Sequence, residues 1–471
     1  MKRLIALLLL VCAPVSAPVT PAADGATLAV GGAAQTDVMV TVYNGNLGLV
    51  KDVRDARFPV GIHEIQYADV ASLIDPTSVH LKSLTDPAAV RILEQNYEYD
   101  LLSSDKLMEK YVGKKVRLYQ PDGTYHEATL LSTAGPIYEI NGQIHIGHNG
   151  RLVLPSLPDN LVAKPTLVWL LRNQTAAPQK VQASYLTRGL NWKADYVMVV
   201  DATETRSDLT GWVTIDNKSG ASYTNAALKL VAGTINRAEE ARVPRALELA
   251  SRAASMADAS RDFKSEGFFE YHLYTLDGRT TLKDNQTKQL TLMAANGVTV
   301  QKQLIYYGAQ DYYRTSYGMP MSNQKVGVYL EWKNSADQRL GVPLPKGKIR
   351  VYKADASGSQ QLIGEDWIDH TPKDEKIKIK MGEAFDVVGE RTQKEWRKIA
   401  SNLYEVEWEI SLRNHKKEDQ TVTVIEPVPG DWQVLTATHA WEKPEAHTLR
   451  FTVPVAKEGA SKLVYRVRLR F

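Results

Sequence analysis

The chain has 471 residues, of which 44% are hydrophobic and 24% are charged, and its formal net charge is +3. This length predicts several domains, and this composition excludes a wholly disordered chain and a membrane protein built from many apolar helices. Because basic and acidic residues nearly balance, the chain has no general attraction to nucleic acid, and we expect no nucleic-acid partner.

The first segment is typical of a secretory signal peptide. Lys2 and Arg3 precede an apolar run at residues 4–11, which is too short to span a bilayer, and small residues and prolines follow as far as Ala23. We therefore expect residues 1–23 to be removed and the chain to be exported. The periplasm is the expected compartment, and the outer membrane and the exterior are the alternatives. Cys12, the single cysteine, lies in this segment and would attach the chain to a membrane if it were lipidated.

Apolar residues alternate with polar ones along most of the chain. Val326, Leu330 and Trp332 fall on one side of an extended segment, and Glu331 and Lys333 fall on the other. A period of two residues indicates half-buried antiparallel strands. The sequence therefore predicts a mainly β, multi-domain protein of immunoglobulin-like β-sandwiches, with a small inserted SH3-like barrel and one short helical arm.

Turn signals and local composition divide the chain into parts. A stretch rich in alanine, arginine and acidic residues, 238–262, predicts the helical or loosely ordered arm. A second helix is expected before the barrel, with Ser104 as its cap. The predicted parts are a flexible leader, an N-terminal β domain, the small barrel, a β-sandwich carrying the arm, and a C-terminal β-sandwich, over residues 24–36, 37–105, 106–160, 161–305 and 306–471.

One unit recurs from residue 165 onward: an apolar strand, an asparagine, a polar turn and another strand. The asparagines are Asn173, Asn217, Asn334 and Asn414, and the tryptophans that precede them are Trp169, Trp212, Trp332 and Trp408. Asparagine suits a hairpin or a sandwich corner because it tolerates positive φ and bonds its own backbone. We interpret each tryptophan as an aromatic anchor on a core strand.

Three segments resemble a known bacterial family. They read SYLTRGLNWKADYVMVV, FFEYHLYTLDGRTTLKDNQTKQLTL and LPKGKIRVYKADASGSQQLIGEDWIDHTPKDEKIKIKMGEAFDVVGER. They are similar to the module called domain of unknown function 4139, found in mucoidy-inhibitor-like exported proteins. The segment VTVYNGNLGLVKDVRDARFPVGIHEI is a weaker match to the module that precedes it in those proteins. The resemblance implies export and a β-rich architecture, and it implies no catalytic residues.

Two clusters are candidate sites. Tyrosines with an acid and an arginine would form a platform for a sugar or a peptide, at Tyr306, Tyr307, Asp311, Tyr312, Tyr313, Arg314 and Tyr317. The alternative is a loop that packs its rings onto the sandwich. Carboxylates beside a histidine would hold a metal ion, at Glu365, Asp366, Asp369 and His370. The alternative is a charged loop between two strands, because the spacing fits no standard metal motif.

No motif for a nucleophile, a phosphate loop or a dinucleotide site is present. We therefore expect a non-catalytic protein of the bacterial envelope, without a cofactor, that binds or scaffolds an envelope protein or a glycan. One alternative is a polysaccharide or peptide hydrolase that uses the cluster at residues 365–375. The other is an outer-membrane-associated protein, because the alternating last strand, which ends at Phe471, resembles the closing strand of an outer-membrane barrel.

Overall fold

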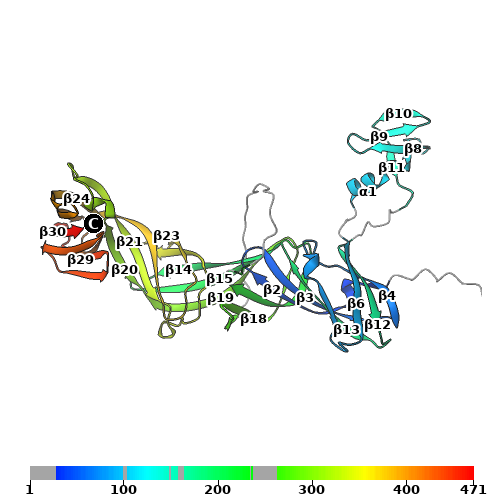
Figure 1. The fold of residues 1–471 in the computed structure, drawn as a ribbon, viewed down its shortest axis with the longest axis horizontal. Coiled ribbons are helices and arrows are strands. Elements are labelled where there is room, and N and C mark those ends of the chain that lie inside the picture. Colours follow the sequence, from blue (N-terminus) through cyan, green and yellow to red (C-terminus); the bar gives the residue numbers. More distant parts are fainter. Residues whose placement is uncertain (1–27, 99–102, 148–149, 157–163, 234, 237–262) are drawn as a thin grey trace, which may run out of the picture. The chain divides into compact units, whose positions relative to one another are not determined.

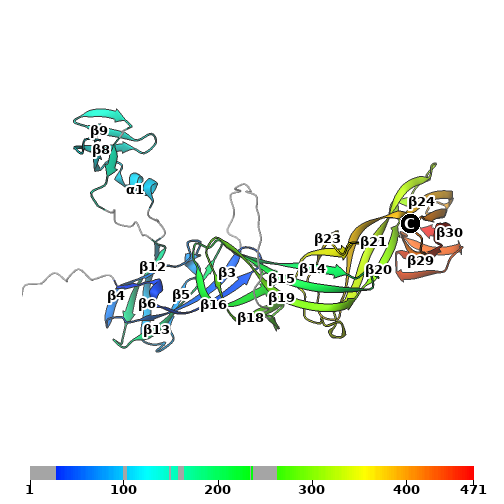
Figure 2. The ribbon, with the colours of Figure 1, turned by 180° about the vertical axis from the view of Figure 1, so that it is seen from behind.

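The computed structural model describes residues 28–471 except 99–102, 148–149, 157–163, 234 and 237–262 (Figures 1 and 2). The described chain contains thirty β-strands and one α-helix, which confirms the predicted mainly β, multi-domain fold. The predicted signal peptide and the predicted arm lie outside the described residues. In the part of the chain that the structure describes, no helix is both long and apolar enough to cross a membrane.

The chain forms two compact units. Unit 1 comprises residues 1–37, 52–72 and 76–185, and unit 2 comprises residues 38–51, 73–75 and 186–471. The boundary between the units falls within three strands, which are β2 (Gln35–Tyr43), β3 (Leu47–Ala56) and β13 (Gln179–Thr187).

Unit 1 contains a four-stranded sheet of order β1-β4-β12-β6. Its strands are β1 (Leu28–Val30), β4 (Gly61–Ala68), β12 (Thr166–Asn173) and β6 (Val90–Glu98). The flexible leader predicted for residues 24–36 is wrong over its described part, because β1 pairs in parallel with β4 and Val30 is buried. Pairing satisfies backbone groups of β4 that a free leader would leave open. Unit 1 also contains β5 (His80–Ser83), which pairs with β13, and short 3-10 turns at Gly32–Ala34 and Pro76–Ser78.

The insertion forms a five-stranded antiparallel sheet of order β10-β9-β8-β7-β11. Its strands are β7 (Lys115–Tyr119), β8 (Tyr125–Ser132), β9 (Ile137–Ile140), β10 (Gln143–Ile146) and β11 (Arg151–Val153). Helix α1 (Ser104–Tyr111) precedes them and contributes Tyr111 to a small separate core. The predicted cap is off by one residue, because the Ser103 side chain accepts the bond from the Lys106 backbone amide.

Unit 2 contains part of one sheet and two complete sheets. The first sheet has seven strands in the order β17-β18-β16-β2-β3-β13-β5, and unit 2 includes β16 (Tyr223–Ala232), β17 (Phe263–Phe268) and β18 (Tyr271–Leu282). The second has the order β19-β15-β14-β22-β23, with β14 (Leu190–Val200), β15 (Arg206–Asn217), β19 (Gln286–Thr299), β22 (Gly347–Ala354) and β23 (Gln360–Ile368).

The third sheet has nine strands, in the order β27-β30-β25-β24-β21-β20-β26-β29-β28. They are β20 (Gln301–Tyr307), β21 (Met321–Lys333), β24 (Lys376–Ala400), β25 (Leu403–Asn414), β26 (Gln420–Pro427), β27 (Asp431–Ala437), β28 (Trp441–Glu445), β29 (Thr448–Val455) and β30 (Gly459–Arg470). Short 3-10 turns lie at Gln310–Tyr313 and Ala336–Gln338. The alternation predicted for the last strand is present, because Leu463, Tyr465, Val467 and Leu469 are all fully buried in one core.

The recurring asparagines occupy equivalent places in the fold. Each lies at or just past a strand end, is almost fully buried, and uses its side-chain amide to tie a turn to another segment. Asn217, for example, donates to the carbonyls of Ala221, Leu282 and Lys283 and accepts from the Ser219 backbone amide. Asn173, Asn334 and Asn414 make corresponding sets of bonds. The predicted role in turns and corners is therefore confirmed, and burial with several partners makes each amide a cross-link between strand ends.

Candidate functional site

A cleft of about 220 Å³ lies between two sheets of unit 2. It is bounded by strands β14, β22 and β23 of the sheet of order β19-β15-β14-β22-β23 and by β20, β21 and β24 of the nine-stranded sheet. All of these strands except β22 are labelled in Figures 1 and 2. We call it the bulge cleft. Its lining residues are Val200, Glu204, Lys302, Val328, Leu330, Lys353, Ile363, Met381, Gly382 and Glu383.

Two β-bulges contribute their extra residues to the lining of this cleft. In the β22–β23 ladder Val351 pairs with Gly364 and the next residue pairs with Leu362, which leaves Ile363 as the extra residue. In the β21–β24 ladder Val328 pairs with Gly382 and the next residue pairs with Lys380, which leaves Met381 as the extra residue. A bulge interrupts the regular pairing of a ladder and leaves its extra residue without a partner on the facing strand. Ile363 and Met381 therefore line the same cleft from different sheets.

Close backbone contact holds the two bulges together. A Cβ atom on Gly364 would lie 2.8 Å from the carbonyl oxygen of Met381, so glycine is required for this approach. Beside it, the Lys380 backbone amide donates to the Asp366 carboxylate at 2.7 Å. Strand β23 is thereby fastened to β24, and the cleft has a fixed wall.

A carboxylate held by two ammonium groups forms one rim of the bulge cleft. Glu204 pairs with Lys302 at 2.5 Å and with Lys353 at 2.6 Å, and all three side chains are about one-third exposed or less. Burial alone would raise the pKa of Glu204, but the hydrogen bonds from the two lysines outweigh it and lower that pKa below its ordinary value. Glu204 lies in the tight turn after β14, where its φ is +60°. With Glu383, the lining carries two positive and two negative charges and is neutral overall.

The predicted metal ligands do not come together. Glu365 pairs with Lys348 and Arg350, whereas Asp366, the next residue along β23, accepts from the backbone of β24. Asp369 is 90% exposed and lies 3.5 Å from Lys346. Among the residues that the structure describes, no group of three or more histidine, cysteine or acidic side chains is arranged to hold a metal ion.

His370 accepts a hydrogen bond at Nδ1 from the Lys346 backbone amide, which leaves its proton on Nε2. Burial lowers the pKa of His370, and the charge of Lys346 lowers it further. The neutral ring thus has a structural role at the end of β23.

The predicted tyrosine platform divides between core and surface. Tyr306 and Tyr313 have no exposed surface, so they are wrong as surface platform residues. Tyr312 and Tyr317 are half-buried and pack against the core. Tyr307, Asp311 and Arg314 are exposed.

Three of these tyrosines, Tyr306, Tyr312 and Tyr313, contact a buried ion pair that the sequence analysis missed. Arg391 on β24 donates through both terminal nitrogens to Glu426 on β26, and both side chains have zero exposure. Tyr313 also donates to Glu426, at 3.0 Å. The Arg391 guanidinium lies 4.9 Å from the Tyr312 ring centre and 5.2 Å from that of Trp408. Burial opposes its charge, but the Glu426 carboxylate raises the pKa of Arg391 well above its ordinary value.

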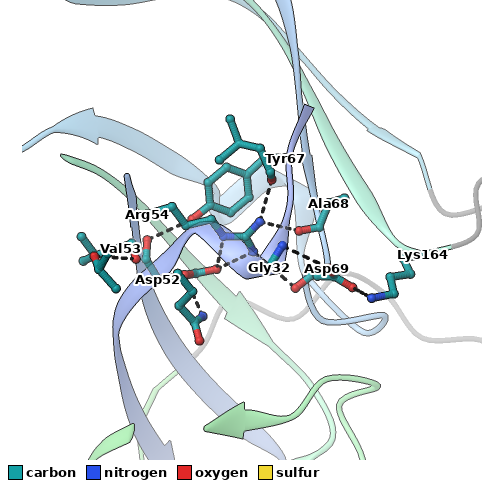
Figure 3. A network of polar contacts seen from close by, with 11 residues as sticks. Gly32, Asp52, Val53, Arg54, Tyr67, Ala68, Asp69 and Lys164 are labelled. Carbon is teal, nitrogen blue, oxygen red and sulfur yellow. Dashed lines mark hydrogen bonds and ion pairs between the residues drawn. The ribbon is translucent and has the colours of Figure 1, made fainter. Parts of the chain in front are cut away.

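A second buried arginine lies in unit 1 (Figure 3). Arg54 has no exposed surface and donates to the Asp52 carboxylate at 2.7 Å and to the Val30 and Ala68 carbonyls at 2.8 and 2.6 Å. Its guanidinium lies 3.7 Å from the centre of the Tyr67 ring, whose hydroxyl donates to the Asp52 carbonyl. All the donors face inward, so this network is a structural cross-link.

The basic side of the last strand is paired within its own sheet. Arg466 contacts Glu407 at 2.7 Å, and Arg468 contacts Glu405 at 2.6 Å, both across the β25–β30 ladder. Opposite charges directly across a ladder stabilise a sheet, so these side chains belong to a cross-strand network.

A family model described as a domain of unknown function (DUF4139) matches residues 181–471. The chain belongs to this family. No curated protein matches the chain. Both the bulge cleft and the Arg391–Glu426 pair are formed within the DUF4139 region, whereas the Arg54 network lies outside it.

Proposed function

We propose that this chain is a non-catalytic, exported protein of the bacterial envelope, and that its bulge cleft binds an uncharged, apolar side chain of a polypeptide. The observation that carries the proposal is the pair of bulges whose extra residues, Ile363 and Met381, line one cleft. Bulges interrupt a ladder and leave a residue unpaired, and they are concentrated beside functional sites.

The size and charge of the bulge cleft select the ligand class. Small-molecule and cofactor sites occupy about 300–1,000 Å³, and this cleft, at about 220 Å³, is smaller. Val328, Leu330 and Ile363 make its walls apolar, and the charges of its two acidic and two basic side chains sum to zero. A charged metabolite would find no net attraction there, whereas a phenylalanine or leucine side chain gains free energy from burial.

A small neutral probe tests the cleft directly. We expect N-acetyl-phenylalanine amide and N-acetyl-leucine amide to shift the methyl NMR signal of Met381, with dissociation constants in the millimolar range. The methyl signal of Met198, which is fully buried in the core, should not move. Ile363→Lys should abolish the response, because it places an ammonium group in the cleft.

Leu362→Lys is the matched control. Leu362 precedes Ile363 and is 55% exposed, but it does not line the cleft, so this variant should keep the response. The Met381 signal is assigned by its loss in Met381→Leu. An unchanged Met381 signal in the wild-type protein, or an equal shift with N-acetyl-lysine amide, would contradict the proposed ligand class.

Export is the second part of the proposal, and Lys2, Arg3 and the apolar run at residues 4–11 support it. We expect cell fractionation to find the shortened chain with the periplasmic proteins. A full-length chain that stays in the cytoplasm would contradict it, and a replaced Cys12 that changes membrane association would reveal lipidation.

A further inference from the structure

Phe385 protrudes from the strand that forms one wall of the bulge cleft. Its side chain is 95% exposed. Along the β21–β24 ladder, Lys325 pairs with Val388 and Gly327 pairs with Glu383, so residues 384–387 lie opposite a single residue, Val326. An aromatic ring with almost complete exposure lacks the free energy that burial would provide. Such a ring is typical of a surface that contacts a partner.

The protrusion is held in place from both sides. Val387 is 1% exposed and Ala384 is 9% exposed, and both belong to the core of the nine-stranded sheet. The His415 backbone amide donates to the Asp386 carbonyl at 2.8 Å. Phe385 is therefore presented by an anchored backbone, which lowers the entropy that a contact would cost.

We propose that Phe385 of one copy of this chain enters the bulge cleft of a second copy, and that two such contacts form a two-fold symmetric dimer. This inference rests on the proposed function and names the polypeptide that supplies the side chain. A phenyl ring is uncharged, as the neutral lining of the cleft requires, and Val328, Leu330 and Ile363 provide apolar walls. Lys302 and Lys353 at the rim add attraction between an ammonium group and the ring face.

The position of the protruding ring favours a second copy over an unrelated protein. Phe385 follows Glu383, a lining residue, by two positions, so the ring and the cleft lie in one region of the surface. When both complementary features lie in one region, a two-fold axis satisfies both contacts at once and the assembly closes. A filament would require the ring and the cleft on different faces.

The expected affinity is moderate, because two rings in two small clefts make a contact below the standard interface size of about 1,600 Å². Sedimentation equilibrium of the intact protein from about 1 to 300 µM should therefore show a monomer–dimer equilibrium with a micromolar dissociation constant. Phe385→Ala and Ile363→Lys should each weaken the dimer by about tenfold or more. Phe269→Ala removes an 88% exposed ring elsewhere and should leave the constant unchanged.

A mixture of the two variants makes the test specific. Phe385→Ala keeps an intact cleft and Ile363→Lys keeps an intact ring, so the mixture restores one of the two contacts. Mixed dimers should form more tightly than dimers of either variant alone. Both substitutions lie at exposed positions, and an unchanged thermal transition checks that each variant is folded.

Three outcomes overturn the inference: a wild-type protein that is monomeric throughout the range, a dimer insensitive to Phe385→Ala, and no gain on mixing. A monomer whose Met381 methyl still responds to N-acetyl-phenylalanine amide overturns self-association alone and leaves the proposed function standing. A monomer without that response overturns both.

Discussion

Replacing Glu426 by alanine is expected to destabilise the nine-stranded sheet by about 3–5 kcal/mol. The substitution leaves the Arg391 guanidinium without its carboxylate in a place where both side chains have zero exposure. It also removes the charged acceptor of the Tyr313 hydroxyl and leaves the Tyr465 hydroxyl as its neighbour. A buried charge without a partner has lost its hydration and gains no ion pair in exchange. The substitution therefore lowers the free energy of unfolding by more than the loss of a surface ion pair would. The measurement is the free energy of unfolding of the β26 region, from hydrogen exchange in urea.

Glu442→Ala is the matched control for this prediction. Glu442 also pairs with an arginine in the same sheet, Arg450, but their side chains are 59% and 39% exposed. Water screens that pair, so its loss should cost less than about 1 kcal/mol. Equal effects of the two substitutions would show that burial does not determine the contribution of Glu426. The double variant Glu426→Ala with Arg391→Met should recover stability, because it removes both charges together.

Asp52→Ala is expected to destabilise unit 1 by an amount of the same order, about 3–5 kcal/mol. Arg54 has zero exposure and receives its only carboxylate contact among the described residues from Asp52, whose side chain is 3% exposed. The Val30 and Ala68 carbonyls remain as acceptors, and Ala68 is labelled in Figure 3, but these carbonyls carry no charge to balance the guanidinium. Hydrogen exchange of the β3 and β4 amides measures the effect.

Asp55→Ala, on the same strand, is the control that separates the effect of burial from the effect of losing a charge. Asp55 pairs with Lys180, and those side chains are 60% and 55% exposed. Its loss should change the free energy of unfolding by less than about 1 kcal/mol. If Asp52→Ala were as mild as Asp55→Ala, the Arg54 network would not be the cross-link inferred from its geometry.

The sequence alone predicts that Glu426 faces the core, because it is a charged residue at a core-facing position of an alternating strand. In β26, Val422 and Val424 are buried and Glu426 continues their side of the strand at zero exposure. Because side chains alternate between the two faces of a strand, the even spacing from Val422 and Val424 predicts that Glu426 faces the core. Its partner could not be found in this way, because Arg391 lies 35 positions away and two strands, β21 and β20, separate β24 from β26 in the sheet order.

The same alternation explains why one of the four tryptophans is not buried in the core as predicted. Trp169, Trp332 and Trp408 are buried as expected, and each is an even number of positions before its asparagine. Trp212 is five positions before Asn217, so the two side chains face opposite sides of β15. Asn217 is buried, and Trp212 is only partly buried.

By itself, the amino-acid sequence determined the strands, the core faces and the asparagine turns, because a strand's alternation and a turn's chemistry are local properties. Only the tertiary structure decided that Ile363 and Met381 line one cleft and that the predicted metal ligands take separate partners. A bulge arises when two strands pair with unequal numbers of residues. The register of two paired strands depends on both strands and on their neighbours, so a bulge cannot be predicted from the sequence of either strand alone.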